Sequence, residues 1–222
     1  MNDRALRPVS KLDSHLASTI RAGRIHRAFS VFVFCPETHA LLIQKRASTK
    51  IVFPRQWANA CCSHPRYVES EMASTGGDNI GVKLAAAQRL EEELGLVRTD
   101  PRSLVFKEKI LYRQISPGNV FGESECDYIL MSQMPCSSQF VPNENEVERT
   151  EWIRPGPTEN PTMNLREFLL EETRKGFPPT PWFDLVLQEP ACLEAWWKGL
   201  IADSKKFMHE QDTCKEFIRS FL

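Results

Sequence analysis

The stretch "VKLAAAQRLEEELGL", residues 82–96, decides the fold class of this 222-residue chain. Residues 82–94 consist largely of strong helix formers, and Gly95 is the residue type at which helices commonly end. Strand-like runs lie on both sides of this helix, and further helical runs follow toward the C-terminus. This order predicts a mixed α/β fold, and no internal repeat or composition break divides residues 1–222 into two domains.

The strand-like runs are rich in apolar and β-branched residues. Residues 28–35 ("AFSVFVFC") and 40–46 ("ALLIQKR") are separated by the turn "PETH", which predicts a hairpin with a four-residue loop. Residues 106–115 and 125–133 predict two more strands joined by the turn at 117–119. A short strand is expected at 150–153.

The remaining segments are read as follows. Residues 1–25 predict an irregular, polar lead-in, residues 47–80 carry few regular signals, and 74–81 predict a loop. Asn164 is expected to cap a helix over the run "LREFLLEETRKG", and more helix is expected at 180–188 and 191–207.

Composition excludes several classes of protein. The 28 basic and 29 acidic residues nearly cancel, which argues against binding nucleic acid or a membrane surface by bulk charge. No apolar run approaches the roughly 18–20 residues of a membrane span, and the polar N-terminus does not resemble a secretory signal. Seven cysteines, an odd number, fit a reducing compartment. We therefore expect a cytoplasmic protein, with the peroxisome as the alternative.

Two carboxylates lie two residues apart in "FGESECDYIL". Glu123 and Glu125 begin a predicted strand, so both point to the same face. Such a pair is most often a solvated strand end, but a cation would also compensate the like charges. The chain has five histidines, and a site of imidazoles and carboxylates suits Mn²⁺, Mg²⁺ or Zn²⁺.

The predicted helix carries Arg89 and Glu93 one turn apart. They form either an exposed ion pair, which is the commoner case, or an arginine that binds phosphate beside a glutamate that helps to hold a divalent ion. Arg46 and Lys50 stand at a strand end and in the following loop, where they are either simply solvated or form a diphosphate clamp with Arg89.

The segment "WANACCSHP", residues 57–65, places Cys62 two residues before His64. A buried cysteine acting as a small apolar side chain is the default interpretation. A structural zinc site would require a second Cys/His pair at matching spacing, and none is visible. A reactive thiol would require a polar or positively charged surrounding.

Taken together, seven ordered blocks between residues 11 and 200 resemble the type I isopentenyl-diphosphate delta-isomerases. They are "HLASTIRAGRIHRAFSVFVF", "LLIQKRASTKIVFP", "WANACCSHP", "AAAQRLEEELGL", "FGESECDYIL", "PNENEV" and "TPWF…WW". The resemblance implies a Nudix-like fold, a mixed sheet sandwiched between helices. It also implies isomerisation of isopentenyl diphosphate to dimethylallyl diphosphate, in isoprenoid biosynthesis, by a monomer or weak dimer.

The resemblance also implies roles for individual residues. The implied ligands of a divalent metal are His15, His26, His64, Glu123 and Glu125, with Glu93 binding a second Mg²⁺ that reaches the substrate. The implied diphosphate contacts are Lys11, Arg46, Lys50 and Arg89. The implied acid–base groups are Cys62 and Glu125, and the implied aromatic pair beside the reacting carbons is Tyr112 and Trp182. We expect Mg²⁺ as the cofactor, with Mn²⁺ or Zn²⁺ as alternatives at one site.

The chemistry is consistent with these residue types. Moving the double bond requires protonation at one carbon and deprotonation at another, through a tertiary carbocation, so the pocket should exclude water. An indole such as that of Trp182 stabilises a cation without attacking it. Our hypothesis is that Glu125 delivers one proton through the region of Tyr112 and that Cys62 removes the other, with the roles exchanged in the reverse reaction.

Several positions depart from the family or superfamily pattern. The end of a Nudix box is retained in "RLEEELGL", but Gln88-Arg89 replaces its Arg-Glu, and Ser74 and Ile80 stand where Gly and Glu are usual. These changes argue against nucleoside-diphosphate hydrolysis. A family strand before Lys11 is expected to be missing, and Ala58, Phe121 and Ser124 replace Thr, Trp and His. The alternatives are a Nudix-type pyrophosphohydrolase and a catalytically silent metal-binding homologue.

Overall fold

The computed structural model describes residues 6–73, 79–97, 99–188, 192–209 and 219–221. Its helices are α1 (Lys11–His15), α2 (Ala17–Arg21), α3 (Glu69–Met72), α4 (Ile80–Leu94), the 3₁₀ helix η1 (Pro101–Ser103), α5 (Met163–Arg174), α6 (Pro181–Gln188), α7 (Leu193–Ala202) and α8 (Ser204–His209). Its strands are β1 (His26–Phe34), β2 (Leu41–Arg46), β3 (Trp57–Asn59), β4 (Cys61–Ser63), β5 (Val105–Ile115), β6 (Gly122–Gln133), β7 (Val147–Ile153) and β8 (Arg219–Phe221).

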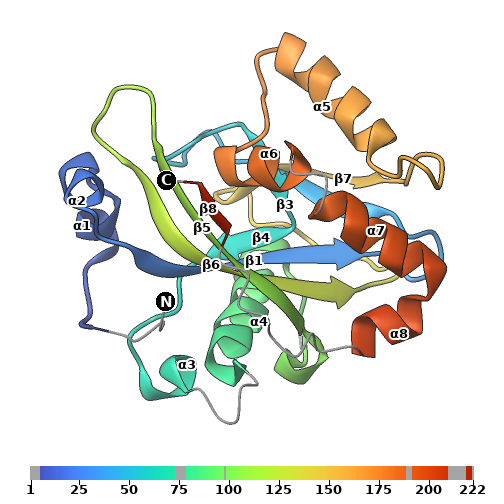
Figure 1. Ribbon diagram of the computed structural model, residues 1–222, viewed down its shortest axis with the longest axis horizontal. Coiled ribbons are helices and arrows are strands. Elements are labelled where there is room, and N and C mark those ends of the chain that lie inside the picture. The colour runs from blue at the N-terminus through green and yellow to red at the C-terminus, as the bar shows by residue number, and fades with distance from the viewer. Residues whose placement is uncertain (1–5, 74–78, 98, 189–191, 210–218, 222) are drawn as a thin grey trace.

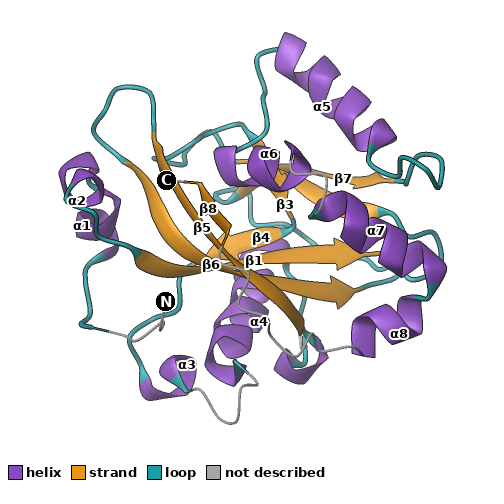
Figure 2. Ribbon diagram, in the orientation of Figure 1, coloured by secondary structure: helices purple, strands orange, loops and turns teal. Residues whose placement is uncertain are grey.

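One mixed sheet forms the centre of the fold (Figure 2). The strand order is β3-β2-β1-β6-β5-β8, with β4 pairing with β1 and β7 pairing with β2. β1 and β6 run parallel, whereas β1 is antiparallel to β2 and to β4. The sheet is therefore mixed, as the sequence predicted.

Helices cover both faces of this sheet (Figure 1). Alternate side chains of β1 point to opposite faces, so Phe32 packs into one core and Val31 into the other. The first core includes Phe183 of α6 and Trp196 of α7, and the second includes Leu90 of α4. The prediction of a sheet sandwiched between helices is confirmed.

The central helix and the longer strands agree with the sequence. α4 ends at Leu94, and Gly95 adopts a left-handed conformation with φ of +69°, which favours glycine. A Cβ on Gly95 would also lie 2.7 Å from the carbonyl oxygen of Val141. The hairpin of β1 and β2 and the pair of β5 and β6 are confirmed. The predicted loop at 74–81 lies mostly outside the described residues, and its last two residues, 80 and 81, already belong to α4.

Other expectations were wrong. The predicted irregular lead-in contains α1 and α2 at residues 11–21, where the Ser10 hydroxyl accepts a hydrogen bond from the backbone N–H of Asp13 and caps α1. The segment 47–80 contains β3, β4 and α3. Asn164 does not cap α5, because it lies inside the helix and its amide instead donates to the carbonyl oxygens of Arg154 and Pro155. The helix expected over 191–207 is interrupted at Asp203, between α7 and α8.

Among the described residues, no helix is both long and apolar enough to cross a membrane.

Candidate metal centre and active site

Five potential metal ligands meet at one end of β1 and β6. Their ligand atoms all lie within 4.8 Å of one another. The three imidazole rings lie in mutual contact, with centroids 4.8 to 4.9 Å apart. The five residues are His15, His26, His64, Glu123 and Glu125. The structure thus brings together all five residues for which the resemblance implies one divalent metal.

Strand pairing explains this convergence. In the parallel pair of β1 and β6, His26 is the register partner of Glu125. Glu123 lies two residues earlier on β6 and so points to the same face as Glu125. His64 follows directly after β4, which pairs with the other edge of β1. Residues 38 to 99 positions away from His26 in the chain therefore become its neighbours through pairing with one strand.

His15 reaches the same point from α1. The backbone N–H of Ala17 donates to the carbonyl oxygen of Val120, which holds the start of α2 beside the turn before β6. Nδ1 of His15 lies 2.5 Å from the carbonyl oxygen of Lys11, so Nδ1 carries the proton and Nε2 faces Glu123 at 3.0 Å. An imidazole held in this tautomer presents the Nε2 lone pair that a metal requires.

The polar contacts within the cluster are incomplete. His64 Nε2 lies 2.9 Å from Oε1 of Glu125, whereas His26 Nε2 lies 3.4 Å from the same oxygen. His26 Nε2 and Oε2 of Glu123 are buried and have no hydrogen-bond partner within the described residues. Buried polar atoms without partners are rare. A divalent cation would satisfy both atoms at once, so the donor set fits a metal.

The pKa shifts within the cluster also fit a metal site. Burial lowers the pKa of His26, but the carboxylates of Glu123 and Glu125, at 3.5 and 3.4 Å from its Nε2, outweigh burial and raise the pKa to about 9. Burial raises the pKa of Glu125, but the neighbouring imidazoles of His26 and His64 hold it well below its usual range. Burial also lowers the pKa of His64. Glu125 is therefore an ionised carboxylate surrounded by imidazoles.

A cavity of about 450 Å³ opens beside the five ligands. Cys62, Tyr112 and Trp182 line it together with Glu125. Cys62 and Glu125 come from β4 and β6, which flank β1 on its two sides, so the thiol and the carboxylate face one shared space. Burial raises the pKa of the Cys62 thiol, so the sulfur keeps its proton at neutral pH.

The aromatic side of the cavity is formed by Tyr112 and Trp182. Their ring centroids lie 6.4 Å apart. Tyr112 is the register partner of Glu125 across β5 and β6, and burial first, then the charge of Glu125, raise the pKa of the phenol. The Tyr112 hydroxyl is therefore a neutral hydrogen-bond donor or acceptor beside the carboxylate.

Asn59 holds the indole in place and was not singled out from the sequence. Its Oδ1 accepts a hydrogen bond of 3.0 Å from Nε1 of Trp182. Its Nδ2 donates to the carbonyl oxygens of Val31 and Cys61, at 3.0 and 2.8 Å. The Asn59 amide is fully buried, and both its oxygen and its nitrogen form hydrogen bonds. It therefore fixes the orientation of the Trp182 indole. In the sequence, the only signal for a role of Asn59 is its position close to "CCSHP".

The other side of the cavity is cationic. Lys11, Arg46, Lys50 and Arg89 all line it. Partial burial first, and then the positive charges of Lys50 and Arg89, lower the pKa of Lys11, which shows how closely these cations gather. Arg46 donates to the carbonyl oxygens of Phe53 and Val52 and lies over the ring of Trp182 at 5.3 Å. Arg46 therefore connects the cationic and aromatic sides.

Glu146, a second residue not singled out from the sequence, pairs with two of these cations. It accepts from Lys50 and lies 2.9 Å from Nη2 of Arg89. These partners keep its pKa low although burial opposes this. Glu146 lies in the segment "PNENEV", whose resemblance to a family loop was the only signal.

Glu93 does not join the five ligands. Its Oε1 accepts from Nε of Arg89 and its Oε2 from Nε2 of Gln44, both at 2.9 Å, and it is almost fully buried. It contacts the cavity only through Arg89, so its role toward a second metal stays a prediction.

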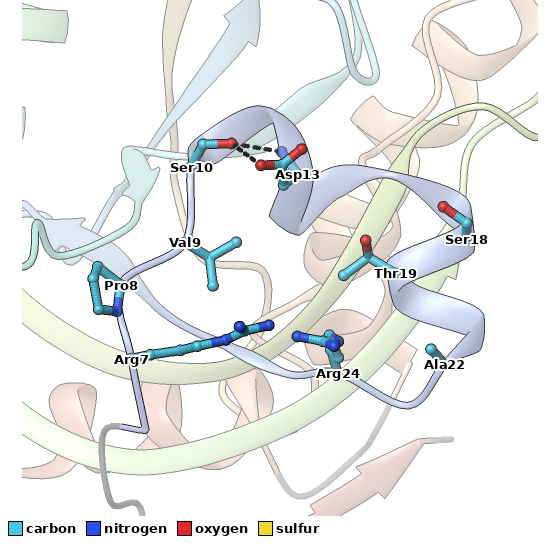
Figure 3. A pocket seen from close by; sticks show the side chains of 9 residues that line it. All are labelled: Arg7, Pro8, Val9, Ser10, Asp13, Ser18, Thr19, Ala22 and Arg24. Carbon is cyan, nitrogen blue, oxygen red and sulfur yellow. Dashed lines mark hydrogen bonds between the residues drawn. The ribbon is translucent and has the colours of Figure 1, made fainter.

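A further cavity, of about 530 Å³, lies beside α1 and α2 (Figure 3). Arg7 and Arg24 extend into it, and the hydrogen bonds of Ser10 to Asp13 close one side. None of the residues predicted to act in catalysis, metal binding or diphosphate binding lines it. The residues predicted to act on the substrate gather instead around the cavity beside Glu125.

The fold and the donor cluster define a Nudix-type protein, and the family model described as NUDIX domain matches residues 24–169. The chain is 39% identical to the isopentenyl-diphosphate delta-isomerase of Phaffia rhodozyma over 90% of this chain and 75% of that protein. Identity is 36% to the enzymes of that name from Gibberella zeae, over 95% and 78%, and Schizosaccharomyces pombe, over 92% and 83%. The chain belongs to the isopentenyl-diphosphate delta-isomerase family.

Proposed function

We propose that this chain interconverts isopentenyl diphosphate and dimethylallyl diphosphate, by metal-assisted proton transfer through a tertiary carbocation. The observation that carries the proposal is the shared cavity, in which Cys62, Glu125 and an aromatic pair face each other beside a cationic wall. Family membership supports the choice of substrate.

The metal site is assigned to His15, His26, His64, Glu123 and Glu125. Mg²⁺ is the proposed cofactor, and a donor set this rich in imidazole also suits Mn²⁺ or Zn²⁺. When bound, the cation supplies positive charge that neutralises the two carboxylates and orders the side chain of Glu125. The buried Nε2 of His26 and Oε2 of Glu123, which have no hydrogen-bond partner within the described residues, support this assignment.

The diphosphate is assigned to the cationic wall of Lys11, Arg46, Lys50 and Arg89. Four cations at one side of the cavity match an anion of two to three charges, and the arginines offer planar pairs of donors to phosphate oxygens. Arg46 is prearranged by its bonds to the backbone of residues 52 and 53. Glu93 is assigned to a second Mg²⁺ that would enter with the diphosphate, and it aligns Arg89 in the free protein.

Proton transfer is assigned to the pair Cys62 and Glu125. In the metal-free chain Cys62 keeps its proton and Glu125 is ionised. The hypothesis that Glu125 delivers one proton and Cys62 removes the other stays a prediction. The reaction is reversible, so each group acts as acid in one direction and base in the other. Tyr112 lies beside Glu125, as its register partner across β5 and β6.

The aromatic pair protects the carbocation. Trp182 is 6% exposed and Tyr112 is 4% exposed, so both present buried ring faces to the cavity. A desolvated indole stabilises a cation by about 2 kcal/mol or more and, unlike water, does not attack it. The hydrogen bond to Asn59 holds the indole in one orientation throughout the reaction.

The test is an isomerisation assay by proton NMR on the purified chain, with Mg²⁺ and after removal of metal with a chelator. We expect conversion in both directions with metal and none without it. A second sample with nucleoside diphosphates tests the hydrolase alternative through phosphate release. Metal-loaded protein that interconverts neither isomer, or that instead hydrolyses nucleoside diphosphates, would overturn the proposal. A cytoplasmic location and a monomeric or weakly dimeric state stay predictions.

A further inference from the structure

Two cysteines meet at the end of the sheet that is far from the metal ligands. β1 and β6 run parallel, and their last residues, Phe34 and Gln133, are register partners. Cys35 follows the first strand directly, and Cys136 lies three residues beyond the second. The arrowheads of both strands lie toward α7, whereas α1 lies at the opposite side (Figure 1). The active-site residues stand at the beginnings of these strands, so the two cysteines are separate from them.

Polar contacts bring the two cysteines together. The backbone N–H of Cys136 donates to Sγ of Cys35 at 3.3 Å, across 101 positions of the chain. Oγ1 of Thr38 lies 3.3 Å from Sγ of Cys136. The thiol of Cys35 donates to Oε2 of Glu37 at 3.0 Å. Each sulfur is thus held by a polar neighbour from the same turn.

The two thiols differ in exposure and acidity. Cys136 is half-buried, whereas Cys35 is 1% exposed. Burial raises the pKa of Cys35, but hydrogen bonds from Cys136 and Thr38 outweigh burial and lower the pKa. The exposed carboxylate of Glu37 is placed to accept the proton of Cys35. A half-buried thiol beside a second thiol whose pKa is lowered is the arrangement of an oxidisable pair.

We propose that Cys35 and Cys136 form a reversible disulfide when the protein meets hydrogen peroxide. The sulfur of Cys136 attacks the peroxide, its O–O bond breaks, and a sulfenic acid and one water form. The sulfur of Cys35 passes its proton to Glu37 and attacks the sulfenic sulfur. The S–S bond forms, the S–O bond breaks, and hydroxide leaves with that proton as a second water. Two thiols and one peroxide give one disulfide and two waters.

The surrounding structure favours this pair over Cys61 and Cys62. The turn that carries Cys35 is fixed by the hydrogen bond from its N–H to the carbonyl oxygen of Ala40 and by Nε1 of Trp197, which donates to the carbonyl oxygen of His39 at 2.7 Å. Cys61 and Cys62 are neighbours in sequence, and burial raises the pKa of both thiols. Those two sulfurs are therefore poorer nucleophiles than Cys35.

The experiment uses the full chain, first reduced and then treated with one equivalent of hydrogen peroxide. Remaining thiols are alkylated, and the digest is analysed by mass spectrometry without reductant. We expect a linked peptide containing Cys35 and Cys136 as the main product, lost on adding dithiothreitol. Thermal unfolding should shift upward by about 5 °C or more after oxidation, because the bond closes a long loop. Neither readout depends on isomerase activity.

Variants test the roles of the two cysteines and of Glu37 separately. Cys136→Ser and Cys35→Ser should each abolish the linked peptide and the thermal shift. Glu37→Gln keeps both thiols but should slow the linkage at least about tenfold, because it removes the proton acceptor. Glu159→Gln, an exposed glutamate elsewhere, is the matched control and should link at the wild-type rate. Both thiols recovered in alkylated or over-oxidised form, or a main linkage to another cysteine, would overturn the proposal. Even if a variant fails to fold, the wild-type peptide map decides.

Discussion

Nε1 of Trp182 donates a hydrogen bond to Oδ1 of Asn59 at 3.0 Å, and this contact joins the two halves of the active site. Asn59 belongs to β3, immediately before the segment that carries Cys62, whereas Trp182 comes from α6. The aromatic wall is thereby connected to the strand that leads to Cys62, the thiol proposed to act in catalysis.

Trp182→Phe keeps an aromatic ring but leaves the buried Oδ1 of Asn59 without a partner. We expect a loss of about 1–3 kcal/mol in the free energy of unfolding, measured by urea denaturation, together with a lower kcat. Trp197→Phe is the matched control, since it breaks the bond to His39 far from the cavity. That control should lose similar stability with little change in kcat. An unchanged kcat in Trp182→Phe would show that the indole does not serve the carbocation.

Glu146→Gln removes the carboxylate that pairs with Lys50 and Arg89. Because a diphosphate would meet less negative charge at these cations, inorganic pyrophosphate should bind about tenfold more tightly, an effect of about 1.4 kcal/mol. Calorimetry measures this affinity. Glu148→Gln, which pairs with Lys45 and Arg55 and does not line the cavity, is the control and should leave it unchanged. Weaker binding by Glu146→Gln would mean that Glu146 positions the cations for the anion.

The variant Glu93→Gln distinguishes between the two proposed metal sites. The five-ligand site does not use Glu93, so metal content of the substrate-free protein should stay the same by elemental analysis. The dependence of turnover on added Mg²⁺ should shift to higher concentrations, because a neutral amide is a poorer Mg²⁺ ligand than a carboxylate. Loss of metal from the substrate-free protein would instead place Glu93 in the first site.

The pKa of His26 predicts how the stability of the metal-free protein depends on pH. The folded-state pKa of about 9 exceeds the ordinary value of 6.5, so the folded state binds this proton more tightly. The contribution is fully present below pH 6.5 and is lost as pH rises through 9, on the order of 3 kcal/mol in total. Urea unfolding across this range measures it. His26→Gln should flatten the profile, and a wild-type profile that is already flat would contradict the shift.

The sequence predicted the elements whose signals are local and long. The helix at 82–94 has strong formers and a terminal glycine, and the runs at 28–35 and 125–133 are apolar enough to form central strands. β3 and β4 have only three residues each and exist because they pair with β2 and β1, so no local pattern reveals them. α1 and α2, with five residues each, are too short to show periodicity.

Some residues of the candidate site were likewise predictable from the sequence, and others were not. Residues with a recognisable motif, such as His64 in "CCSHP" or Glu123 in "GESECDYIL", were found from the sequence and now lie together. Asn59 and Glu146 act through contacts with residues 123 and 57 positions away, and such pairing is visible only in three dimensions. The pKa values of Cys62 and Glu125 depend on burial and, for Glu125, on neighbouring imidazoles, so these shifts were not readable from residue types.

The most direct test of the whole account compares turnover and metal content in the same samples of wild type, Cys62→Ser and Cys61→Ser. We predict that Cys62→Ser loses nearly all interconversion of the two isomers while holding as much metal as wild type, and that Cys61→Ser stays close to wild type in both. A Cys62→Ser enzyme as fast as the wild type would contradict the account, because the sulfur facing Glu125 would then have no part in the chemistry.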